Sequence, residues 1–141
     1  MTRPTPAVEA DLIAKITALL PAEFPAARVF SDAEESVGAA VDEHATFVKF
    51  SDQVADDYDG NGAVRVRTYQ VKHRFDRTPD RKGAAALARM AKLYDTLHKL
   101  GPWTGTSGTD YIDIEARTFP RLLEETYVVM DVSVWLDTAA T

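Results

Sequence analysis

Apolar residues recur at spacings of three and four over residues 83–100, which places them along one side of an α-helix. These positions are Ala86, Leu87, Met90, Leu93, Tyr94, Leu97 and Leu100. Thr78 can cap the N-terminus with Pro79 in the first turn, and Gly101-Pro102 ends the helix. We expect this helix to cover one face of a small sheet.

The rest of the chain predicts a first helix and several strands. Residues 7–20 carry a second apolar stripe at helical spacing, and Pro21 follows it. Strands are predicted at residues 28–30, 45–51, 63–75, 111–119 and 127–137, the last with the clearest alternation. The alternation in residues 63–75 changes side near Thr68, which favours a bulge or bend, and the length of this strand suggests an arm extending past the sheet.

This order of elements predicts one α+β domain over residues 1–141. We expect a single mainly antiparallel or mixed sheet of four to five strands, with two helices packed on one face. Residues 1–6 contain two prolines and little apolar surface, so we expect a flexible arm. The glycine-rich residues 101–109 predict a flexible surface loop with Trp103 as an anchor or a contact residue.

Composition is that of a globular chain, with 45% hydrophobic and 27% charged residues and no cysteine. The absence of cysteine excludes disulfides and thiolate metal sites. The sequence shows neither a signal peptide nor an apolar run long enough for a membrane span. These features predict a chain that does not associate with a membrane.

Charge is distributed unevenly. Residues 61–100 hold ten Lys or Arg against three Asp, a balance of +7 that leaves −13 for the rest of the chain. Two solvated faces would explain this, as would complementary patches that join copies head to tail. For the second case the expected interface residues are Arg65, Arg67, Arg74, Arg77, Arg81 and Lys82 against Asp56, Asp57 and Asp59, with Trp103 as a further contact.

The residues from Asp57 to Gly62 match the first half of a calcium-binding loop, but position 12 of that motif is Thr68 rather than glutamate. A turn that uses Asp, Asn and Gly for their backbone geometry is the better interpretation. His44, His73 and His98 lie on different predicted elements, and no serine-nucleophile or phosphate-loop motif is present. We therefore predict no catalytic, cofactor or metal site.

Four segments together resemble the tail terminator and minor capsid (head–tail joining) proteins of tailed bacteriophages. They are the strand YQVKHRF, the helix ALARMAKLYDTLHKL, and the strands IDIEARTFP and VVMDVSVWL, within residues 68–136. The matching positions are Gln70-Val71, then Ala84, Ala88, Ala91, Leu93, Tyr94, Asp95, Leu97 and His98, and finally Asp131 to Val134. Residues 1–50 match only as a helix followed by strands.

The resemblance implies a structural virion protein rather than an enzyme. Such a protein forms a ring, usually a hexamer, that caps the completed tail tube and joins it to the head connector. The implied partners are further copies of the chain, the tail tube protein and the connector or stopper protein, with genomic DNA passing through the ring. The implied location is the tail–neck junction of the virion, assembled in the host cytoplasm.

Two alternatives stay open. One is another neck, connector or head-closure protein of the phage. The other, from a different class, is a small cytosolic ligand-binding domain or enzyme, which would place a pocket and a titratable cluster around His73 and Asp110 to Glu115.

Overall fold

A computed structural model describes residues 7–31, 45–56, 64–75, 80, 82–98, 100–123 and 127–137, with the side chains of residues 54–56 and 137 left out of that description. Several sequence predictions lie outside this part of the chain. They are the arm at residues 1–6, the loop that follows residue 31, the turn at residues 57–63 with its partial calcium motif, and the proposed cap at Thr78 and Pro79.

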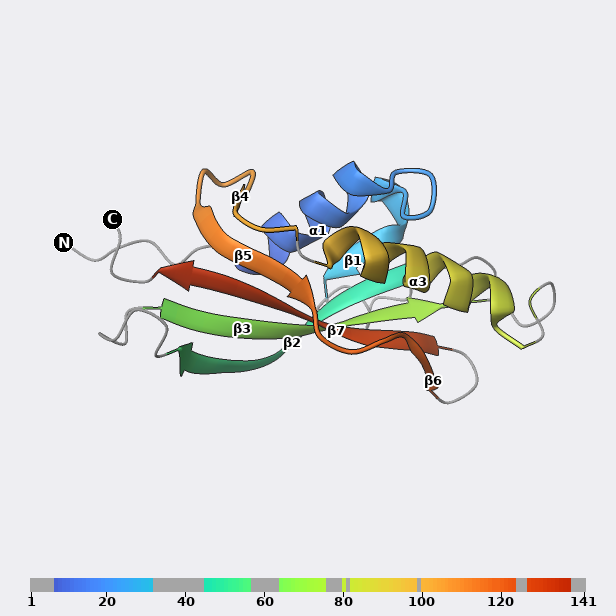
Figure 1. Cartoon of the computed structure of the whole chain (residues 1–141). Helices are drawn as coiled ribbons and strands as arrows, with labels where there is room; N and C mark the ends of the chain where they lie inside the picture. The colour runs from blue at the N-terminus through green and yellow to red at the C-terminus, as the bar shows by residue number, and fades with distance from the viewer. Residues whose placement is uncertain are drawn as a thin grey trace.

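The described residues form an α+β fold, as predicted (Figure 1). In chain order the elements are α1 (Val8–Leu19), η1 (Ala26–Arg28), β1 (Val29–Ser31), β2 (Ala45–Asp56), β3 (Val64–Arg74), α3 (Ala84–Leu97), β4 (Trp103–Thr104), β5 (Asp110–Ala116), β6 (Arg121–Leu123) and β7 (Tyr127–Asp137). The sheet has seven strands instead of four to five, because β4 and β6 are too short to leave a period in the sequence. Both α-helices lie on the same side of the sheet.

The sheet is mixed, with the strand order β1-β2-β3-β7-β5-β4. Only β1 and β2 are parallel, and every other pair is antiparallel. The long β7 has two partners on its outer side, β6 along its first residues and β5 along its last ones. The sheet therefore has five strands across each end, sharing β2, β3 and β7.

The predicted bulge lies in β2 rather than in β3. The register of β2 with β3 shifts between Phe50 and Asp52, opposite Tyr69 and Thr68, whereas β3 pairs with β7 without a shift. The alternation changes side near Thr68 because the two ends of β3 bury opposite faces. Val64 and Val66 are buried on the face away from the helices, whereas Tyr69 and Val71 are buried on the helix face. The expected protruding arm is also absent from residues 64–74, because that whole stretch pairs with both neighbours.

One hydrophobic core fills the space between the helices and the sheet. Each α-helix contributes one stripe of side chains to it, and the sheet contributes alternate residues of its long strands. The most deeply buried members are Leu12 and Ile16 of α1, Met90, Leu93 and Leu97 of α3, and Val71, Ile114, Met130, Val132 and Val134 of the sheet. The two apolar stripes predicted from the sequence are thus confirmed.

The central helix is shorter than predicted, with 14 residues. It starts after Gly83, whose φ of 72° is left-handed, and ends at Leu97. The carboxylate of Asp80 accepts hydrogen bonds from the backbone N–H groups of Ala85 and Ala86, at 3.2 and 3.0 Å. An aspartate upstream of the helix therefore binds the first free N–H groups, the role that a capping side chain performs.

Replacing Gly83 by alanine is expected to destabilise the fold strongly. A Cβ there would lie 2.7 Å from Cζ of Phe75 and 3.0 Å from Cδ2 of Leu122, in addition to the backbone strain of a positive φ, about 1–2 kcal/mol. Gly108→Ala is the matched control, because Gly108 also has a positive φ but no atom within 4 Å of such a Cβ. Urea unfolding should show a clearly larger loss for Gly83→Ala; equal losses would contradict the packing argument.

Candidate functional site

A buried carboxylate, Asp11, binds the glycine-rich loop to α1. Its two oxygens accept four hydrogen bonds, from the hydroxyls of Thr106 (3.1 Å), Ser107 (2.6 Å) and Tyr111 (2.5 Å) and from the backbone N–H of Ser107 (3.0 Å). Only 1% of Asp11 is exposed. Hydrogen bonds to a charged acceptor are stronger than those between neutral groups, so this carboxylate fixes the loop that leads into β5.

These hydrogen bonds determine the protonation of Asp11. Burial alone would raise the pKa of the carboxyl, but the hydrogen bonds from Ser107, Tyr111 and Thr106 outweigh burial and lower it. Burial and the adjacent Asp11 carboxylate raise the pKa of the Tyr111 hydroxyl in turn. Asp11 therefore stays ionised and Tyr111 stays protonated at neutral pH, which is the state that these hydrogen bonds require.

The glycine-rich loop lies at the surface, as predicted, but its residues Trp103 and Gly105 are buried and closely packed. A Cβ on Gly105 would lie 2.2 Å from the Asp11 carboxyl, so only glycine fits there. Trp103 stacks on Tyr111 with ring centres 4.2 Å apart, and its indole N–H donates to the carbonyl of Asp113. With 6% of its surface exposed, Trp103 anchors the loop and offers little surface to a neighbour.

A second buried polar cluster surrounds His73 beneath α3. Arg89 donates to Nε2 of His73 (2.6 Å), and Nδ1 lies 2.8 Å from the hydroxyl of Thr46. Because a guanidinium can only donate, Nε2 carries no proton, and the proton of the neutral ring is on Nδ1, where it donates to Thr46. Phe24 contacts the ring edge-on. Arg89 itself is half-buried.

The ligand-binding alternative required His73 to cluster with residues 110–115, and the structure separates them. His73 pairs with Val128 near the start of β7, whereas Tyr111 pairs with Leu136 near its end. Eight residues of extended strand span about 26 Å. Within the described part of the chain, no group of three or more His, Asp or Glu side chains could hold a metal ion.

The basic residues predicted for an interface do not form one patch. Arg65 and Arg67 point to the face of β3 that carries the helices, where Nε of Arg67 donates to the amide oxygen of Gln53. Arg74 lies on the other face, about 30 Å along the strand, with its guanidinium 5.5 Å from the ring centre of Phe47. The structure thus brings two of these arginines together and separates the third.

The remaining predicted interface residues give less information. Lys82 is exposed just before α3. Asp56 pairs through its backbone with Val64, and its side chain lies outside the description. The other four, Arg77, Arg81, Asp57 and Asp59, lie outside the described residues. Their role in assembly stays a prediction.

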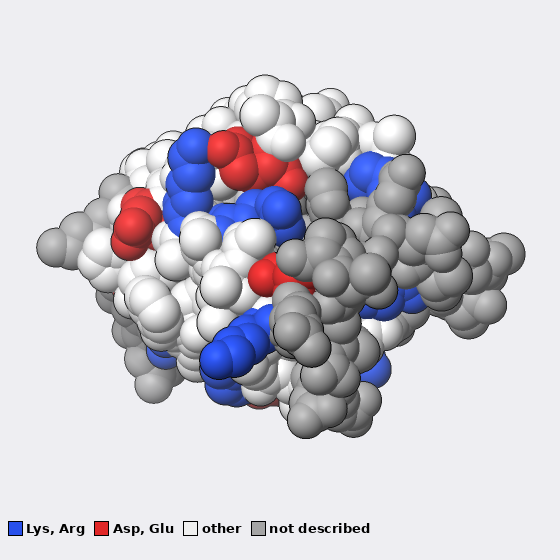
Figure 2. Space-filling model, turned by 90° about the vertical axis from the view of Figure 1, so that its right-hand side faces the viewer, with Lys and Arg blue, Asp and Glu red and all other residues white. Residues whose placement is uncertain are grey.

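Part of the charge asymmetry is neutralised within the molecule. Lys92 of the basic segment forms an ion pair with Glu23 of the acidic N-terminal part. Figure 2 shows acidic and basic side chains next to one another on the side of the molecule that it presents, instead of a broad patch of one sign. On this side the charges are therefore mixed and are not separated into an acidic and a basic face.

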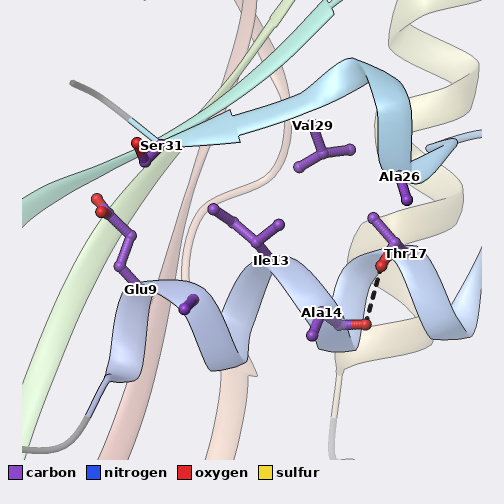
Figure 3. A pocket seen from close by; sticks show the side chains of 8 residues that line it. Glu9, Ile13, Ala14, Thr17, Ala26, Val29 and Ser31 are labelled. Carbon is purple, nitrogen blue, oxygen red and sulfur yellow. Dashed lines mark hydrogen bonds between the residues drawn. The ribbon is translucent and has the colours of Figure 1, made fainter. Parts of the chain in front are cut away.

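An open pocket of about 460 Å³ lies between α1 and β1 (Figure 3). Its walls are mostly apolar or small side chains, with one carboxylate at one end. They belong to Glu9, Ala10, Ile13, Ala14 and Thr17 of α1 and to Ala26, Val29 and Ser31 near β1. We call it the α1–β1 pocket.

Apolar side chains are exposed at the opposite edge of the sheet. Four large apolar side chains are exposed among the described residues, and three of them, Phe119, Leu122 and Leu123, lie in or next to β6. Phe119 is 63% exposed and contacts the ring of Tyr94 on α3, which itself stacks on His98. We call these three residues the apolar edge; no pattern in the sequence distinguished them.

Comparisons with known proteins add no family. No family model matches the chain, and no curated protein matches it. No helix of the described residues is long and apolar enough to cross a membrane.

Replacing Asp11 by asparagine is expected to destabilise the protein by about 1–3 kcal/mol, because its four donors, including the hydroxyl of the buried Tyr111, lose a charged acceptor. The lowered pKa of Asp11 means that its stabilisation is present above the pKa of an unfolded aspartate, about 3.9, and is lost as the pH falls through the folded-state value. Urea unfolding from pH 7 down to pH 2 should therefore show a smaller pH dependence in Asp11→Asn than in the wild type.

Asp110→Asn is the matched control, because Asp110 is exposed and accepts a single hydrogen bond from Thr104 in the same loop. Its unfolding should be close to that of the wild type. Equal losses in the two variants would show that Asp11 does not hold the loop.

Proposed function

We propose that the chain is a ring-forming structural protein of a tailed phage virion, the tail terminator that caps the tail tube and contacts the head connector. The proposal begins from the resemblance over residues 68–136. In the structure this stretch forms a unit that includes most of β3, α3, β5 and β7. The residues that carry the resemblance therefore lie in three neighbouring strands and in the helix that packs on them. This arrangement supports comparing the whole stretch with the tail terminator family.

The observation that carries the proposal is the apolar edge. Phe119, Leu122 and Leu123 are 63%, 48% and 37% exposed and lie within one short stretch of chain that includes β6. Single exposed apolar residues are ordinary, but a group of them at a strand edge is typical of an interaction site. A subunit that functions only in a homo-oligomer buries such an apolar surface against the neighbouring copy.

The polar clusters of the interior are also consistent with a structural role. Asp11 is used fully by four donors, and His73 is enclosed with both ring nitrogens bonded. The groups that could titrate or bind a ligand therefore hold elements together: α1 to the loop before β5, and α3 to β2 and β3. Among the described residues, the edges of the sheet and the α1–β1 pocket are the features that we assign to contact with partners.

The mass of the purified full-length chain in solution tests this function. Light scattering across a range of concentrations, with negative-stain images of the main peak, should show closed rings of about six copies with a central opening. The reason is that a heterologous contact closes into a ring when its rotation divides a full turn evenly and is not accompanied by a shift along the axis. A chain that is monomeric at every concentration, or that forms open filaments, would contradict the proposal.

A further inference from the structure

Among the described strands, and apart from β4 at the other end of the sheet, the edge strands β1 and β6 lie at the same end of the molecule. A continuous row of paired residues runs across that end, from Val29 of β1 through Thr46, His73 and Val128 to Leu122 of β6. Among the described residues, β1 pairs only with β2, and β6 pairs only with β7. Five strands at a spacing of about 4.8 Å put these two edges roughly 19 Å apart.

The surfaces next to the two edges lie on the same side of the sheet. Leu122 pairs with Val128 of the core and approaches Gly83 at the start of α3, so it lies on the side that carries the helices. Phe119 contacts Tyr94 of α3 on that side as well. The α1–β1 pocket opens between a helix and the outer strand, again on the helix side (Figure 3).

The two surfaces are complementary in shape and polarity. One edge presents projecting apolar side chains, and the other provides a pocket whose walls include Ile13, Ala14 and Val29. They are also complementary in charge, because the exposed Arg121 lies within β6 and Glu9 lines the pocket. A strand edge with exposed apolar residues is the kind of surface that binds another chain by strand addition.

We propose that β6 of one copy docks beside β1 of the next, with Phe119 and Leu122 against the α1–β1 pocket of that second copy. The inference rests on the proposed function, because it names the contact that would build the ring. The strand directions allow it: β1 is parallel to β2, and three antiparallel steps lead to β6, so the added β1 runs antiparallel to β6. The contact joins two different surfaces, which is the heterologous type that generates rings.

Two substitutions test the two sides separately. Leu122→Asp puts a charge into the apolar edge, and Ala14→Arg fills the pocket with a cation that repels Arg121 of the neighbour. Both positions are partly or fully exposed, so each variant should keep the far-ultraviolet circular dichroism of the wild type. Light scattering should show that each variant alone has lost the ring and has the mass of a single chain.

Mixing the two variants gives the decisive measurement. The Leu122→Asp chain keeps an intact pocket and the Ala14→Arg chain keeps an intact apolar edge, so one productive contact remains between them and no further copy can be added. An equimolar mixture should therefore form a dimer of the two variants. A mixture that stays monomeric would overturn the proposed contact, since it would show that the two surfaces are not partners.

Matched controls separate this contact from general effects of charge. Ala18→Arg adds the same side chain to an exposed position of α1 that does not line the pocket, and Ala88→Asp adds the same charge as Leu122→Asp to an exposed position of α3 that belongs to neither surface. Both controls should keep the mass of the ring. If the wild type forms rings and both test variants keep them, the edge contact is wrong while the ring proposal stands; if the wild type is a monomer, the ring proposal itself fails.

Discussion

Eleven residues of β3 pair with eleven residues of β7 without any shift of register, and the other elements depend on this pairing. Because β3 and β7 are joined along their whole length, the two halves of the sheet cannot move independently. The outer strands then divide between the halves: β1 and β6 border one end, and β5 with β4 borders the other. The bulge in β2 lets that strand follow the long pair across both ends.

The sequence predicted the two helices and the long strands well, because each buries a periodic set of apolar residues and the period is visible without any partner. It did not predict β4 and β6, whose pairing comes from the neighbouring strand rather than from their own residues. It also extended α3 to residue 100, whereas the helix ends at Leu97, and it did not identify the carboxylate of Asp80, which binds N–H groups five and six residues ahead. The sequence predicted a bulge in β3, but the bulge lies in β2. In a single sequence, a bulge and a change in which face of the strand is buried give the same break in alternation.

The polar interior was harder to predict, although its residues left a signal. Asp11 lies on the buried stripe of α1 next to Leu12, where a carboxylate needs several donors, and the loop at residues 105–109 is made of glycine, serine and threonine. Reading these two facts together would have suggested the contact, but their separation of about 95 residues is fixed only by the fold. The same is true of His73 and Arg89, whose contact depends on how α3 crosses β3. Spacing along a helix shows which residues share a side. It does not show which polar side chain of the sheet, such as His73, lies opposite them.

Sheet edges are usually protected, by charge, by proline, by a bulge or by a covering segment, since an open edge invites pairing with another chain. β6 has a single charged residue, Arg121, followed by two exposed leucines, and β7 is covered by β6 only along its first residues. A strand of three residues has few backbone groups to pair, so the side chains around it determine whether another chain can pair with this edge.

Phe119 and Leu122 are large enough to bury substantial area on a partner, and each lies beside α3, Leu122 near its start at Gly83 and Phe119 against Tyr94. Because the row from Val29 to Leu122 crosses five paired strands, a contact made at one edge would be transmitted through paired backbone to the other, giving successive copies the constant geometry that a closed ring needs.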